Sequence, residues 1–191
     1  MTLRLLAFAA SLRRGSINRK LLGPVVEQAR AAGAEVDVAE FAEFEMPMFN
    51  ADVQAASGFP PGAEELARRV RAADGMLIVS PEYNYSLPGT LKNAIDWISR
   101  PDPGERHLAV FRGKPAGIVS ATPGPHGGSR GLKQLRELLG MIGVAVEDQL
   151  GIADSGGAFD GSGRLSRAAD IAALDRLAST VAQAAAQGAT V

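Results

Sequence analysis

The 191-residue chain contains no cysteine and only two histidines. Without thiols it cannot form disulfides, use a cysteine nucleophile, or hold zinc or an iron–sulfur cluster through cysteine. His107 and His126 are too few for a multi-histidine metal site, so we expect no metal. The chain also has no excess of charge of either sign, because its 20 Lys and Arg residues nearly balance its 21 Asp and Glu residues. A protein that binds nucleic acid or a membrane surface usually has a basic excess.

Long hydrophobic runs are absent as well. No run approaches the roughly 18 residues that a membrane-spanning helix needs. The apolar stretch 5–10 is too short for the core of a signal peptide. Apolar residues nevertheless make up 46% of the chain, which favours a folded core, and the length fits one domain. We therefore expect a single cytoplasmic domain over residues 1–191 with no membrane or nucleic-acid partner.

Short apolar runs alternate with amphipathic stretches along the chain. The runs predict five strands, at residues 3–10, 35–41, 75–80, 115–121 and 144–152. Helical spacing predicts helices at residues 16–32, 64–73, 90–99, 131–142 and 165–187. Pro24 inside the first helix predicts a kink, or a break after Leu22, and the prolines of 101–104 predict a turn. Because parallel strands need long crossovers, the alternation predicts an α/β doubly wound parallel sheet with helices on both faces.

Polar loops follow the first, third and fourth predicted strands, at 11–19, 81–89 and 120–130. Ligands of such sheets bind beyond the carboxyl ends of the strands, where the strand order reverses. The first loop has the serines, amide and guanidinium of a phosphate site. The alternative is an N-cap at Ser16 beside a solvated basic turn, but the loop holds more polar groups than capping requires. The second suits a flat heterocycle or is an ordinary loop with surface tyrosines. The third has glycines that permit close backbone approach to a ligand, or that make it flexible.

Several other patterns have simpler interpretations. Residues 127–131 match the nucleophile elbow G-x-S-x-G, but both histidines precede Ser129, whereas a hydrolase needs its histidine after the serine. We interpret His126 as a polar loop residue and Trp97 as a core residue. Segment 41–59 holds four of the seven phenylalanines. It packs either against its own domain or against another subunit.

The loops resemble those of a known family, the NAD(P)H-dependent FMN reductases of flavodoxin-like fold, which include quinone, chromate and azo-dye reductases. Ser11-x-Arg13-x-x-Ser16-x-Asn18 is similar to the family's FMN-phosphate loop. Residues 81–86 and 88–97 resemble its flavin-edge segment, and residues 127–130 its third loop. Residues 47–52 resemble its segment after the second strand. The similarity covers roughly residues 3–165, and Ala10 stands where the family usually has glycine.

This resemblance implies strand order 2-1-3-4-5, FMN as the cofactor and NADPH or NADH as the hydride donor. The residues that it assigns to FMN are Ser11, Arg13, Ser16, Ile17 and Asn18 at the phosphate, Pro81, Glu82, Tyr83 and Asn84 at the isoalloxazine edge, and Ser120, Gly127 and Gly128 beside the ribityl chain or ring. It names no side chain as a general acid or base, because the flavin carries the redox chemistry.

The implied function is hydride transfer from a nicotinamide through flavin N5 to a small-molecule acceptor: a quinone, an azo compound, chromate or free flavin. The resemblance also implies a homodimer or homotetramer with segment 41–59 at an interface. One alternative is a flavodoxin-type electron carrier that binds FMN without a nicotinamide step. Such carriers are usually strongly acidic, whereas this chain has a net charge of −1. The second alternative to a reductase is a structural or regulatory domain that binds no flavin.

Overall fold

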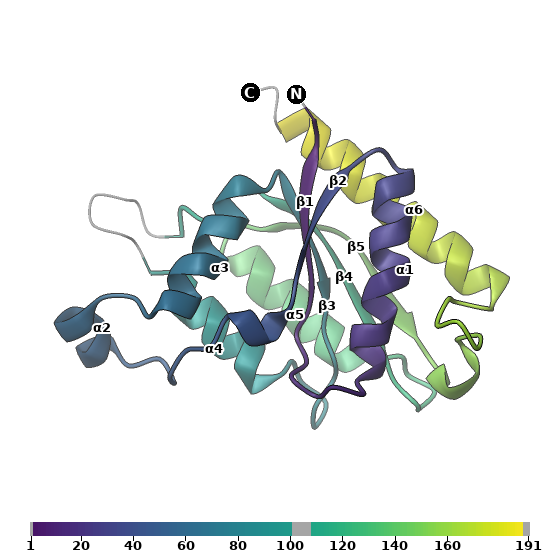
Figure 1. The fold of residues 1–191 in the computed structure, drawn as a ribbon, viewed down its shortest axis with the longest axis horizontal. Helices are drawn as coiled ribbons and strands as arrows, with labels where there is room; N and C mark the ends of the chain where they lie inside the picture. The colour runs from purple at the N-terminus through teal and green to yellow at the C-terminus, as the bar shows by residue number, and fades with distance from the viewer. Residues whose placement is uncertain (1, 101–107, 189–191) are drawn as a thin grey trace.

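The computed structural model describes residues 2–100 and 108–188, and its centre is one parallel sheet (Figure 1). The strands are β1 (Arg4–Ala9), β2 (Glu35–Ala39), β3 (Gly75–Val79), β4 (Pro115–Ala121) and β5 (Ala145–Ile152). Their order is β2-β1-β3-β4-β5, and every neighbouring pair is parallel. The predicted fold class and strand order are therefore confirmed.

Helices cover both faces of the sheet. They are α1 (Ile17–Ala31), α2 (Ala51–Ser57), α3 (Pro61–Ala72), α4 (Gly89–Ile98), α5 (Ser129–Met141) and α6 (Ala168–Gly188), with single 3₁₀ turns η1 (Phe41–Glu43) and η2 (Ser155–Gly157). Side chains alternate between the faces along each strand. Leu5 of β1 packs in a core with α1 and α6. Leu6 packs in the other core, with α3, α4 and α5, where Trp97 is fully buried as predicted.

The predicted break at Pro24 was wrong, because α1 is continuous from Ile17 to Ala31. An interior proline removes one helical hydrogen bond and costs about 3 kcal/mol. Leu21 and Val25, on either side, are completely buried, and burying a side chain of that size contributes about 1.5–3 kcal/mol. Packing against the sheet therefore offsets the missing bond.

Two further differences lie after β2. The strand ends at Ala39 rather than at residue 41, because Phe41 begins η1 and stacks on Phe8 with ring centroids 5.7 Å apart. Helix α2 was not predicted, and none of its residues is buried, so it has no apolar stripe to detect. The predicted turn at 101–104 and His107 lie outside the described residues.

The carboxyl ends of all five strands lie along one edge of the sheet, at the bottom of Figure 1. The order reverses between β1 and β3, so the loops after β1, β3 and β4 flank this point. Within residues 2–100 and 108–188, no helix is both long and apolar enough to cross a membrane. The same residues contain no cluster of three or more side chains able to ligate a metal.

Candidate functional site

The loop between β1 and α1 forms a polar turn at the N-terminus of the helix. Ser11 and Ser16 are buried, and the Ser16 hydroxyl caps α1 by accepting a hydrogen bond from the Asn18 N–H at 3.2 Å. The Ile17 N–H has no acceptor among the described residues. First-turn N–H groups of a helix are unpaired and carry a partial positive charge, so they attract anions. Ala10 is completely buried, and its N–H donates to Val79 O at 2.8 Å.

The Asn18 side chain is engaged by the protein itself. Its Nδ2 donates to Ala121 O at 3.0 Å, and the Ala121 N–H donates to its Oδ1 at 2.8 Å. The amide thus imitates a strand neighbour at the end of β4 and joins the first loop to the third. With both amide atoms used, Asn18 is placed to position the N-terminus of α1.

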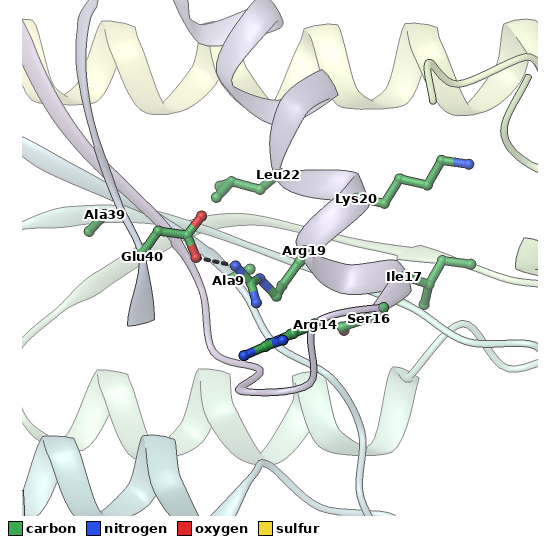
Figure 2. Close-up of a pocket in the computed structure, with 10 residues that line it drawn as sticks. Ala9, Arg14, Ser16, Ile17, Arg19, Lys20, Leu22, Ala39 and Glu40 are labelled. Carbon is green, nitrogen blue, oxygen red and sulfur yellow. Dashed lines mark hydrogen bonds and ion pairs between the residues drawn. The ribbon is translucent and has the colours of Figure 1, made fainter. Parts of the chain in front are cut away.

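Arg13 and Arg14, which lie between β1 and α1, differ in what surrounds them. Both are exposed, but Arg14 lines a pocket of about 480 Å³ between α1 and the ends of β1 and β2 (Figure 2). Arg19 forms an ion pair with Glu40 there, while Lys20 points away and its ammonium lies 5.0 Å from the Phe159 ring centre. This pocket lies at the ends of β1 and β2, and Ser16 and Ile17 at the start of α1 also line it. Arg13 does not line it.

The loop after β3 folds into a tight turn at residues 83–86. The Tyr83 N–H donates to Ser86 O at 2.9 Å, and the Ser86 N–H donates to Tyr83 O at 3.0 Å. Asn84 and Tyr85 have φ of 50° and 64°, which with the paired hydrogen bonds defines a type I′ turn. Asn tolerates this left-handed conformation, whereas for other non-glycine residues it costs about 1–2 kcal/mol. Tyr85 is therefore strained.

The loop after β4 contacts the ends of β4 and β5 through glycines. Gly127 and Gly128 have φ of 56° and 77°. A Cβ on Gly128 would lie 2.2 Å from Ser120 Oγ, and a Cβ on Gly127 would lie 2.7 Å from the Gly151 carbonyl carbon. Ser120 Oγ is buried beneath Gly128 and has no hydrogen-bond partner among the described residues. The loop backbone, rather than Ser120, therefore forms the outer surface here.

Three contacts join these loops into one site. Ser11 Oγ lies 3.4 Å from Tyr83 Oη, between the first and second loops. Asn18 and Ala121 join the first and third loops. The Gly131 N–H of α5 donates to Glu82 Oε2 at 2.7 Å and joins the second loop to the helix that follows the third. The structure thus brings together all three predicted loops. Pro81 is buried, Tyr83 and Asn84 are exposed, and Tyr83 contacts the first loop.

Two side chains of α5, Gln134 and Arg130, contact the turn at 83–86 and were not predicted from the sequence. Gln134 belongs to a helix with ordinary amphipathic spacing and lies in no motif, whereas Arg130 lies in the segment 127–130 that resembles the family's third loop but received no role there. His126 is exposed in the third loop, in keeping with its interpretation as a polar loop residue.

A parallel sheet of order 2-1-3-4-5, with a phosphate-type loop and two further loops meeting at its switch point, defines a flavodoxin-like α/β protein. The chain belongs to the NADPH-dependent FMN reductase family, whose sequence model matches residues 3–156. It is therefore an oxidoreductase that uses FMN and a nicotinamide nucleotide, and the electron-carrier and flavin-free alternatives are set aside.

Comparison with individual proteins agrees with this assignment. The chain is 38% identical over 165 residues to an NAD(P)H-dependent FMN reductase of Pseudomonas aeruginosa, covering 85% of this chain and 84% of that protein. It is 41% identical over 145 residues to a quinone reductase of Escherichia coli K12, covering 75% and 73%. A solved flavoenzyme NAD(P)H:(acceptor) oxidoreductase of Paracoccus denitrificans shares the fold, with a TM-score of 0.79, 23% identity and coverage of 98% and 99%.

Proposed function

We propose that this enzyme transfers hydride from NADPH or NADH to an FMN held by the three loops, and then to a quinone. The meeting of the three loops at the switch point is the observation that carries the proposal. The quinone rests on the similarity to the E. coli quinone reductase. Azo compounds, chromate and free flavin are further acceptors that the proposal allows, and the proposed location is the cytoplasm.

The residues of the first loop fit the phosphate of FMN. The unpaired Ile17 N–H lies at the positive end of α1, beside the Ser11 and Ser16 hydroxyls. Arg13 supplies a charge without an acidic partner among the described residues. These are the groups with which proteins bind phosphate. We assign Ser11, Arg13, Ser16 and the Ile17 backbone to the phosphate, and Asn18 to the positioning of that loop.

The second and third loops fit the rest of the cofactor. The isoalloxazine edge would be contacted by Pro81, Glu82, Tyr83 and Asn84. Because the Glu82 carboxylate already accepts a hydrogen bond from the Gly131 N–H, Glu82 would contact the flavin through its backbone. The Gly127–Gly128 backbone, with Ser120 beneath it, would flank the ribityl chain or ring. FMN supplies the redox chemistry by accepting a hydride and passing on two electrons. The chain's own residues bind it, orient it and exclude water.

The purified protein should contain one FMN per chain and no FAD, because the single phosphate loop leaves no second site for an adenylate. Anaerobic stopped-flow mixing with NADH or NADPH should bleach the flavin absorbance rapidly, and a benzoquinone should restore it. Heat release and chromatography identify the flavin. FAD at full occupancy, or bleaching by neither nucleotide, would contradict the proposal.

The proposed assembly is a homodimer or homotetramer with segment 41–59 at an interface. Much of this segment packs within its own chain: Phe41 and Phe44 are buried, and Phe49 meets Trp97 edge-on at 5.1 Å. Asn93 fixes the segment by donating to Pro47 O and accepting from the Phe49 N–H. Met48 remains 77% exposed between these anchors, more than Val53 at 42%, which makes it the most exposed large apolar side chain of the segment and available to a second subunit.

Met48→Asp should shift the protein toward monomer, because an unpaired charge in an interface is costly. Met141→Asp is the matched control, since Met141 is 80% exposed and lies at the end of α5. Light scattering at micromolar concentration measures both. A wild-type monomer, or equal effects of the two substitutions, would exclude the proposed interface.

A further inference from the structure

Helix α5 is hydrogen-bonded to the strained turn at 83–86 through the side chain of Gln134. Gln134 Nε2 donates to Tyr85 O at 2.9 Å, and the Ser86 hydroxyl donates to Gln134 Oε1 at 2.6 Å. The amide therefore bonds two consecutive residues of the turn. One helical turn earlier, the Arg130 guanidinium lies 4.9 Å from the centre of the Tyr85 ring. These contacts hold the residue that has the unfavourable φ.

The first turn of the same helix also packs closely against the turn at 83–86. Gly131 binds the Glu82 carboxylate, and a Cβ at Gly131 would lie 3.2 Å from Ser86 O and from Glu82 Cγ. The turn thus lies directly on the first turn of α5. A strained backbone conformation persists only when surrounding contacts hold it in place. Here the directional contacts are the two hydrogen bonds of Gln134.

We propose that Gln134 is a positioning residue for the flavin: it holds Tyr85 in the left-handed conformation. It thereby fixes Tyr83, which contacts Ser11 of the first loop, and Asn84 next to it in the turn. Gln134 touches neither of those two residues, and it acts through the turn. This inference rests on the proposed function, because it takes residues 81–84 as the edge of the flavin site. It adds that affinity for the ring depends on a residue of α5 about 50 positions away in sequence.

Gln134 acts on how often the turn occupies its flavin-binding conformation. Without Gln134, the turn loses two hydrogen bonds while the φ of Tyr85 stays unfavourable, so that conformation is populated less. Apparent affinity falls in proportion to this population. Two solvent-exposed hydrogen bonds predict a loss of roughly three- to tenfold. Because the turn lies at the ring end, FMN and riboflavin should lose the same factor.

The test is titration of the flavin-free protein with FMN and with riboflavin, in which quenching of the flavin fluorescence reports binding. Gln134→Ala should weaken both flavins roughly three- to tenfold. It should change the melting temperature of the flavin-free protein little, because the two lost hydrogen bonds are solvent-exposed and alanine favours a helix position. Lys133→Ala, at the neighbouring exposed position of α5, is the matched control and should change neither affinity.

A second variant separates positioning from other roles of the amide. Tyr85→Gly creates an Asn-Gly pair, which adopts a type I′ turn without side-chain strain. In that background, Gln134→Ala should no longer change either dissociation constant. An unchanged affinity in the single variant Gln134→Ala, or an equal loss in both backgrounds, would overturn the inference. Failure of the wild-type protein to bind FMN would instead overturn the proposed function.

Discussion

Arg13→Ala should weaken FMN binding by roughly ten- to a hundredfold, whereas Arg14→Ala should change it only a few-fold. A charge-assisted hydrogen bond to phosphate contributes about 1.5–3 kcal/mol, and each 1.4 kcal/mol corresponds to a factor of about ten. The family pattern places Arg13 at the phosphate and gives Arg14 no role there, so we expect the Arg14 charge to act only as a screened attraction through solvent. Fluorescence titration with FMN measures both effects.

Riboflavin is the control ligand for this pair, because it has no phosphate. Arg13→Ala should leave its affinity nearly unchanged, in contrast to the equal loss of both flavins expected for Gln134→Ala. The two substitutions therefore address opposite ends of the same ligand. Equal effects of Arg13→Ala and Arg14→Ala on FMN would show that the loop is only a diffuse basic surface and that the phosphate assignment is wrong.

Asn18→Ala should lower the free energy of unfolding by about 2–5 kcal/mol, because it leaves two buried backbone groups of Ala121 without partners. The substitution removes the 3.0 Å hydrogen bond to Ala121 O and the 2.8 Å hydrogen bond from the Ala121 N–H. Urea denaturation of the flavin-free protein measures the effect. The family resemblance alone assigns Asn18 to the phosphate and would predict weaker FMN binding with unchanged stability.

Asn18→Asp sharpens this test. The carboxylate keeps the acceptor for the Ala121 N–H but faces the Ala121 carbonyl oxygen without a proton to donate, so stability should again fall. If Asn18→Ala left the unfolding free energy unchanged and weakened FMN without affecting riboflavin, the positioning role would be refuted in favour of direct phosphate binding.

The sequence predicted the sheet well because the central strands β1, β3 and β4 are short apolar runs buried on both faces, while the edge strands β2 and β5 keep apolar residues at intervals. The positions of the loops followed from that sheet, since its switch point depends on strand order. The predicted break after Leu22 was wrong because the sequence shows the local cost of Pro24. It does not show the tertiary packing that buries Leu21 and Val25 and offsets this cost. Helix α2 was not predicted because it has no buried side chains and therefore no periodic pattern of apolar residues.

Residue roles were less predictable than positions. A motif identifies Asn18 but does not show that Ala121, 103 residues later, occupies its amide. The strain at Tyr85 is likewise invisible in the sequence, because no sequence pattern indicates a positive φ for this tyrosine. Gln134 matters only through that strain, so the pattern of α5 by itself could not have identified it.

The glycine-built third loop has a consequence for chemical durability. Quinones, the acceptors that we propose, are electrophiles that alkylate thiolates and amines. Gly127 and Gly128 present peptide backbone where other residues would present a side chain, and they cover the hydroxyl of Ser120. With no cysteine in the sequence, this wall offers an electrophile no sulfur to attack. Alkylation of a cysteine by the acceptor is therefore excluded, and the nucleophiles left to it are amines and imidazoles such as the exposed His126 of the same loop.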